Sequence, residues 1–175
     1  MANPDRAYGF KPWGPLLAVK HLQKDAAAAA FGINDVVLQT TDGGVDVAGA
    51  AGTISNTVGV SLEYSATGTA GRVMLAIDPN QIMQAQDDGA GSDDFALATL
   101  GETGDSTFTT LNTTTKISTQ ELDTDTLDAS GVNQFLLLDI LLSDNTDGTT
   151  NALGDNGDYI VQWAAHRRGS STVGV

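Results

Sequence analysis

Most residues of this chain that could do chemistry are carboxylates, and they do not follow the spacing of a known catalytic site. The 175-residue sequence holds 22 Asp and Glu residues, two histidines and no cysteine. His21 and His166 lie far apart, and neither belongs to a zinc-binding pattern such as His-Glu-x-x-His. The sequence also lacks the glycine-rich turns that hold a serine nucleophile, a nucleotide phosphate or a dinucleotide. We therefore expect no enzymatic activity and no cofactor.

Two clusters of aspartates carry the oxygen ligands that calcium and magnesium prefer. The clusters are Asp123, Asp125 and Asp128, and then Asp144, Asp147, Asp155 and Asp158. Neither has the spacing of an EF-hand, because the required glycine and the distal glutamate are missing. Aspartate also stabilises turns by bonding to its own backbone. A structural divalent cation and solvated turns are both compatible with these clusters, and we expect solvated turns and no metal site.

The charged residues are unevenly placed along the chain, whose net charge is −14. All carboxylates except those of Asp5 and Asp25 lie between residues 26 and 166, where only Arg72 and Lys116 oppose them. Because residues 26–166 are so acidic, they repel the phosphate backbone of nucleic acids, and we expect no nucleic-acid partner. A saline habitat or a need for solubility would explain the acidity equally well. No apolar run approaches the roughly 20 residues needed to cross a bilayer, so we expect no membrane contact.

Residues 1–24 are predicted to form an extended N-terminal arm, because three of the four prolines lie there and disfavour helix. An isolated extended segment cannot bury its aromatic rings against itself. These rings must dock either on the protein's own core or on a neighbour. A partner that responds to charge should meet the basic residues near the two ends. The candidate partner contacts are Arg6, Tyr8, Phe10, Lys11, Trp13, Lys20, Lys24, Arg167 and Arg168.

The rest of the chain is predicted to be a β-rich core domain over residues 25–168, followed by a flexible tail over residues 169–175. Apolar runs between Gly and Asp turns predict strands at residues 36–39, 45–48, 53–60, 72–77, 81–86 and 159–165. Residues 41–44, Thr-Asp-Gly-Gly, predict a hairpin turn. We also interpret residues 26–30 as strand and residues 87–127 as the loosest region. Gly148, Gly154 and Gly157 are expected to take positive φ angles.

Three segments of the sequence together resemble one protein family. They are AYGFKPWG at residues 7–14, RVMLAIDPNQIMQAQDDG at residues 72–89, and residues 118–166, which begin with STQELD and include the run FLLLDILLSDNTDGTTNALGDNGDYIVQWAAH. The resemblance is to the capsid-decorating or cement proteins of tailed bacteriophages, which are encoded beside the major capsid protein. Trp13 departs from the small aliphatic residue usual in the family, and residues 144–150 lengthen the last turn.

The resemblance implies an all-β fold: a jelly-roll-like sandwich or a small β-barrel with an extended N-terminal arm. It also implies a structural virion protein on the outer surface of an icosahedral phage head. There it would bridge subunits of the major capsid protein, associate with itself as a dimer or trimer, and stabilise the capsid. The alternative is a head-fibre, tail or adhesin-like β domain that binds a cell-surface glycan, since Thr-rich and Gly-rich β proteins serve there too.

Overall fold

The protein is all-β and contains two antiparallel sheets, of six and five strands, arranged as a sandwich. The computed structural model describes residues 5–48, 56–67, 71–89, 97–107, 111–129, 133–141, 155–167 and 170–171. Within these ranges neither sheet closes into a barrel. The predicted all-β class is therefore confirmed, in the form of a sandwich.

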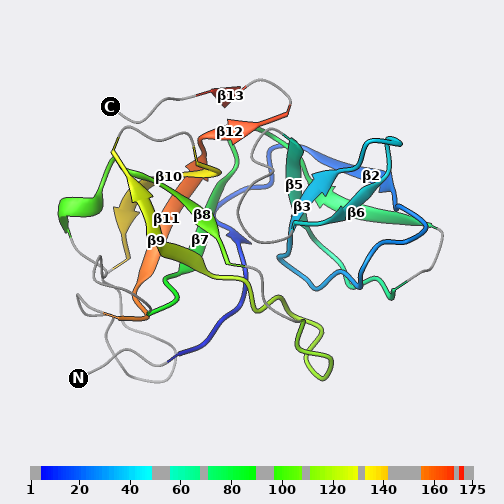
Figure 1. The fold of residues 1–175 in the computed structure, drawn as a ribbon, viewed down its shortest axis with the longest axis horizontal. Coiled ribbons are helices and arrows are strands. Elements are labelled where there is room, and N and C mark those ends of the chain that lie inside the picture. Colours follow the sequence, from blue (N-terminus) through cyan, green and yellow to red (C-terminus); the bar gives the residue numbers. More distant parts are fainter. Residues whose placement is uncertain are drawn as a thin grey trace.

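The six-stranded sheet lies on the left of Figure 1. Its strands, in spatial order, are β1 (Lys11–Pro12), β7 (Ile82–Gln86), β11 (Asp158–Trp163), β10 (Phe135–Ile140), β8 (Thr103–Ser106) and β9 (Leu122–Asp128). On β11 the buried residues Tyr159, Val161 and Trp163 alternate with half-buried ones, as expected for a strand with one face on a core.

The five-stranded sheet lies on the right of Figure 1. Its strands, in spatial order, are β2 (Val19–Gln23), β6 (Arg72–Ala76), β5 (Thr57–Ser61), β3 (Val36–Gln39) and β4 (Val45–Val47). The sheet is curled, because a parallel bridge joins Lys24, just after β2, to Val45 on the opposite edge strand. The remaining elements are the short 3-10 helix η2 (Leu97–Thr99) and the strand pair β12 (Ala165–His166) and β13 (Ser170–Ser171).

Two hydrophobic clusters hold the fold together, one on each face of the five-stranded sheet. The first lies between the sheets and includes Val36 on β3 with Phe135 and Trp163 of the six-stranded sheet. The second fills the other face of the five-stranded sheet and includes Val37 on β3 and Phe31. Because neighbouring residues on a strand point to opposite faces, Val36 and Val37 belong to different clusters.

Residues 5–24 are extended, as predicted, but they are built into both sheets. Strand β1 pairs with β7, and β2 pairs with β6. Phe10, just before β1, is fully buried and stacks on Phe135 with ring centroids 4.2 Å apart. Of the two docking surfaces that the sequence left open for the aromatic rings, Phe10 uses the protein's own core.

Several strand predictions are confirmed. Strand β3 has the predicted bounds, and β4, β6 and β7 differ from them by one residue at one end. Of the strand predicted at residues 53–60, the structure shows β5 at Thr57–Ser61, and residues 53–55 lie outside the described residues. The hairpin at residues 41–44 is also confirmed, because Gly43 has φ of 90° and the N–H of Thr40 donates to the carbonyl of Gly44 at 2.9 Å.

Other predictions about local structure are wrong. Residues 26–30 form no strand, because the carboxylate of Asp25 accepts the N–H of Ala27 at 2.7 Å and turns the chain. The region expected to be loose contains β8 and β9. In the last turn the positive φ falls on Asn156, at 56°, and not on Gly157. Gly148 and Gly154 lie outside the described residues.

Candidate functional site

A row of exposed apolar side chains follows the chain where it crosses from the six-stranded to the five-stranded sheet. We name it the docking band. Its members and their exposed fractions are Trp13 (44%), Leu16 (48%), Leu17 (52%), Val19 (44%) and Ile82 (36%). Four of them lie within seven residues of the chain and the N–H of Trp13 donates to the carbonyl of Ile82, so exposed apolar residues are concentrated in one region, as they are in interaction sites.

The backbone of the docking band is fixed by the start of β7. The N–H of Trp13 donates to the carbonyl of Ile82 at 2.8 Å, and the N–H of Leu17 donates to Oε1 of Gln81 at 3.1 Å. Gln81 is itself 1% exposed, and its side-chain amide donates to the carbonyl of Ile82 at 3.0 Å. The buried Gln81 therefore holds the backbone of the docking band in place, while the large apolar side chains of the band remain exposed to solvent.

Three of the candidate contact residues lie on the same exposed segment. Trp13 belongs to the docking band, and Lys11 and Lys20 are exposed on β1 and β2, next to it in sequence. The band thus combines apolar anchors with two cations on a protein whose net charge is −14. The sequence reasoning missed Leu16, Leu17, Val19 and Ile82. The adjacent leucines after Pro15 were the available signal, because they do not alternate with polar residues as on a half-buried strand.

Phe10 and Lys24 were predicted to contact a partner, but the structure buries both side chains within the protein itself. Phe10 lies in the core between the sheets. Lys24 is 3% exposed, and its ammonium donates to Oγ of Ser65 at 3.0 Å and to the carbonyl of Ala66. Burial lowers the pKa of Lys24 from its ordinary value.

The other candidate contacts are separate from the docking band. The hydroxyl of Tyr8 donates to the carboxylate of Asp158 at 2.5 Å, and burial is the main reason that the pKa of Tyr8 is raised. Arg6 is half-buried, and its backbone N–H donates to Oε1 of Gln86 at 2.6 Å. Arg167 is exposed but follows β12 and lines the pocket described below. Arg168 lies outside the described residues.

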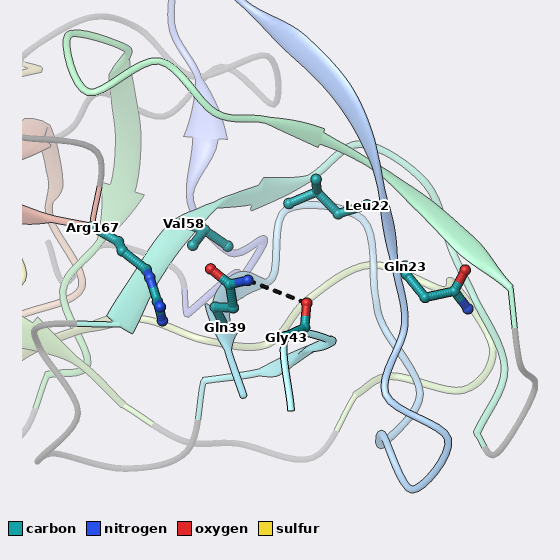
Figure 2. A pocket seen from close by; sticks show the side chains of 6 residues that line it. All are labelled: Leu22, Gln23, Gln39, Gly43, Val58 and Arg167. Atoms are coloured by element: carbon teal, nitrogen blue, oxygen red, sulfur yellow. Dashed lines mark hydrogen bonds between the residues drawn. The ribbon is translucent and has the colours of Figure 1, made fainter. Parts of the chain in front are cut away.

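A pocket of about 260 Å³ lies on the curled five-stranded sheet (Figure 2). Its lining residues are Leu22, Gln23, Gln39, Gly43, Val58 and Arg167. They come from β2, β3, the β3–β4 hairpin, β5 and the segment after β12. The pocket thus joins residues from both ends of the chain, a proximity that sequence spacing does not reveal.

Carboxylates gather where β9 lies beside the end of β7. Burial, and then the charges of Asp5, Asp88 and Asp87, raises the pKa of Glu121 from its ordinary 4.5 to about 7. Burial and the charge of Asp88 also raise the pKa of Asp123. The fold therefore places like charges together, which favours their protonated forms.

The described parts of the chain contain no group of three or more His, Cys, Asp or Glu side chains that could hold a metal ion. In the first aspartate cluster, Oδ1 of Asp123 accepts the N–H of Asp125 at 3.1 Å, but both residues lie in strand β9 and not in a turn. In the second cluster, Asp158 accepts the hydroxyl of Tyr8. Asp144 and Asp147 fall outside the described residues.

Comparison with known proteins assigns no family to the chain. No protein-family model matches it, and no curated protein matches it. Within the described ranges, no helix is long and apolar enough to cross a membrane.

Proposed function

We propose that this protein is a structural virion protein that binds the outer surface of an icosahedral phage head and bridges subunits of the major capsid protein. The observation that carries the proposal is the docking band, which presents apolar side chains and two lysines on an otherwise acidic β-sandwich. The resemblance of three sequence segments to capsid-decorating proteins supports the same function.

The docking band has the composition of an interface. Trp13 is of the residue type most often found among energetic hot spots, and Leu16 and Leu17 widen the apolar contact. Lys11 and Lys20 favour a lattice surface that carries negative charge. The acidic body then faces solvent and is repelled by DNA.

A repeated lattice makes modest contacts sufficient for stable coating. A protein that touches two capsid subunits, or that binds as a dimer or trimer, converts its second contact into an intramolecular event. Dissociation then requires several contacts to break together, and the bridged subunits are held against the pressure of packaged DNA. This role needs no catalytic group, cofactor or metal.

The test is co-sedimentation of the protein with undecorated phage heads. The double variant Trp13→Ala with Leu17→Ala removes two exposed anchors, and at about 2 kcal/mol for each we expect affinity to fall by several hundred-fold or more. The matched control is Leu97→Ala, because Leu97 is 62% exposed on η2 and lies outside the band.

Two results would contradict the proposal. One is full-occupancy binding by the double variant, which would mean that another surface holds the capsid. The other is a native protein that is found only on fibres or tails by negative-stain microscopy, which would favour the glycan-binding alternative.

A further inference from the structure

The pocket on the five-stranded sheet is lined by residues of β2 and of the β3–β4 hairpin, which lie at the two edges of the curled sheet. The bridge between Lys24 and Val45 brings β2 close to β4, although three strands separate them in the order of the sheet. Val58, which is 2% exposed, and Leu22 belong to or pack on the second hydrophobic cluster. Both side chains line the pocket and supply its apolar surface (Figure 2).

Arg167 places a positively charged guanidinium in the same pocket as these apolar side chains. Its backbone is held by β5, because its N–H donates to the carbonyl of Thr57 at 2.9 Å. Its guanidinium makes a long contact of 3.5 Å with Oδ1 of Asn56, which is a neutral partner. No carboxylate among the described residues forms an ion pair with it. This is notable because the protein has many more carboxylates than cations, and it leaves donors of Arg167 available to an anion.

Gln39 supplies an acceptor opposite the cation. Its side-chain amide donates to the carbonyl of Gly43 at 3.2 Å, which orients the group. Figure 2 shows the oxygen of this amide on the side that faces Arg167, whereas the side chain of Gln23 points away from the pocket. The pocket therefore presents donors and an acceptor beside apolar side chains.

We propose that this pocket binds a small ligand that carries a carboxylate and neighbouring hydroxyl groups, such as one uronic acid unit of a polysaccharide. The planar guanidinium of Arg167 fits a carboxylate, with which it can form paired hydrogen bonds. Oε1 of Gln39 accepts a hydrogen bond from a hydroxyl group. Leu22 and Val58 contact the carbon atoms of the sugar ring.

The size of the pocket limits the ligand to one ring. Its volume of about 260 Å³ is below the range of about 300–1,000 Å³ typical of pockets for drug-sized ligands. The net charge of −14 repels an anion, so we expect affinity in the millimolar range and a dependence on salt. None of the pocket residues belongs to the docking band, so the two sites share no residue.

The experiment is an NMR titration of the full chain with sodium glucuronate, followed through the backbone amides. We expect saturable shifts at Gln39, Gly43 and Val58, and at least tenfold weaker binding of both glucose and acetate. Arg167→Gln should weaken glucuronate binding at least tenfold. Arg167→Lys, which keeps the charge but loses the planar fork, should give an intermediate affinity. The control Lys116→Gln changes the net charge equally, outside both the pocket and the docking band, and should leave the affinity within twofold.

The proposal is overturned if Arg167→Gln binds glucuronate as the native protein does, or if Lys116→Gln loses as much affinity. It is also overturned if glucose binds as tightly as glucuronate, since the carboxylate would then have no role. Equal affinity for acetate would show a bare anion site without recognition of hydroxyl groups. Unchanged amide shifts away from the pocket establish that each variant is folded.

Discussion

Replacing Phe10 and Trp13 separately distinguishes a structural role of the N-terminal segment from a binding role. Phe10 is fully buried, and its ring lies 4.2 Å from that of Phe135, which in turn lies 4.8 Å from the ring of Trp163. Trp13, three residues later, is 44% exposed. The two changes to alanine remove aromatic rings of comparable size from opposite environments.

The expected magnitudes follow from burial. Truncation of a buried Phe to Ala costs about 3–5 kcal/mol, which includes the loss of packing around the new cavity. For Phe10→Ala we expect a loss of about 4 kcal/mol of unfolding free energy. For Trp13→Ala we expect a change within about 0.5 kcal/mol, as for other surface substitutions.

The assay is urea unfolding followed by circular dichroism, because Trp13→Ala alters the fluorescence signal. With a slope of about 2 kcal/mol per molar urea, the midpoint of Phe10→Ala should fall by about 2 M and that of Trp13→Ala should not move measurably. A midpoint for Phe10→Ala within about 0.3 M of the native value would refute the reasoning. Residues 5–24 would then act as a separable arm, as a free N-terminal extension does.

Three further results are expected. Glu121 binds its proton more tightly in the folded state, so it stabilises the fold below pH 4.5 and loses this contribution as pH rises through about 7. Glu121 should therefore lower the free energy of unfolding by about 1–2 kcal/mol between pH 5 and pH 8, a value reduced for partial solvent exposure. Urea unfolding of Glu121→Gln at the two pH values should lack this decrease, and an unchanged decrease in the variant would exclude this role. Gly59→Ala places a Cβ against the carbonyl of Ala76 and should lower the free energy of unfolding by about 1–3 kcal/mol. Thermal unfolding measures this loss, and an unchanged melting temperature would show that β6 moves away to accommodate the methyl group. Raising salt should weaken head binding only partly in co-sedimentation, because screening acts on Lys11 and Lys20 but not on the apolar contacts, whereas complete release would make charge the main attraction.

Local sequence patterns were sufficient for part of the fold. Strand β3 and the Asp42-Gly43 turn that follows it were predictable, because a short apolar run and a residue with positive φ each specify local geometry. Strands β8 and β9 were not predictable in this way, because several of their buried positions are polar. Asp105, for example, is buried on β8 and accepts the N–H of Gln134 at 3.0 Å.

The candidate site was less predictable, because exposure depends on which distant segments meet. Phe10 and Trp13 both read as aromatic residues of an extended segment, but only Phe10 lies opposite Phe135. Lys24 is buried because β2 ends beside Val45 and the loop at Ser65, neither of which is near it in sequence. The docking band likewise required β7, since Ile82 completes it from a strand far along the chain.

The most direct test of the proposed function is a cryo-EM map of undecorated phage heads incubated with this protein. We predict additional density on the outside of the head, with the two-sheet sandwich resolved and with Trp13 and Leu17 facing the capsid lattice across a boundary between subunits. A map in which the heads remain bare, or in which the docking band faces solvent while another surface touches the lattice, would contradict the account.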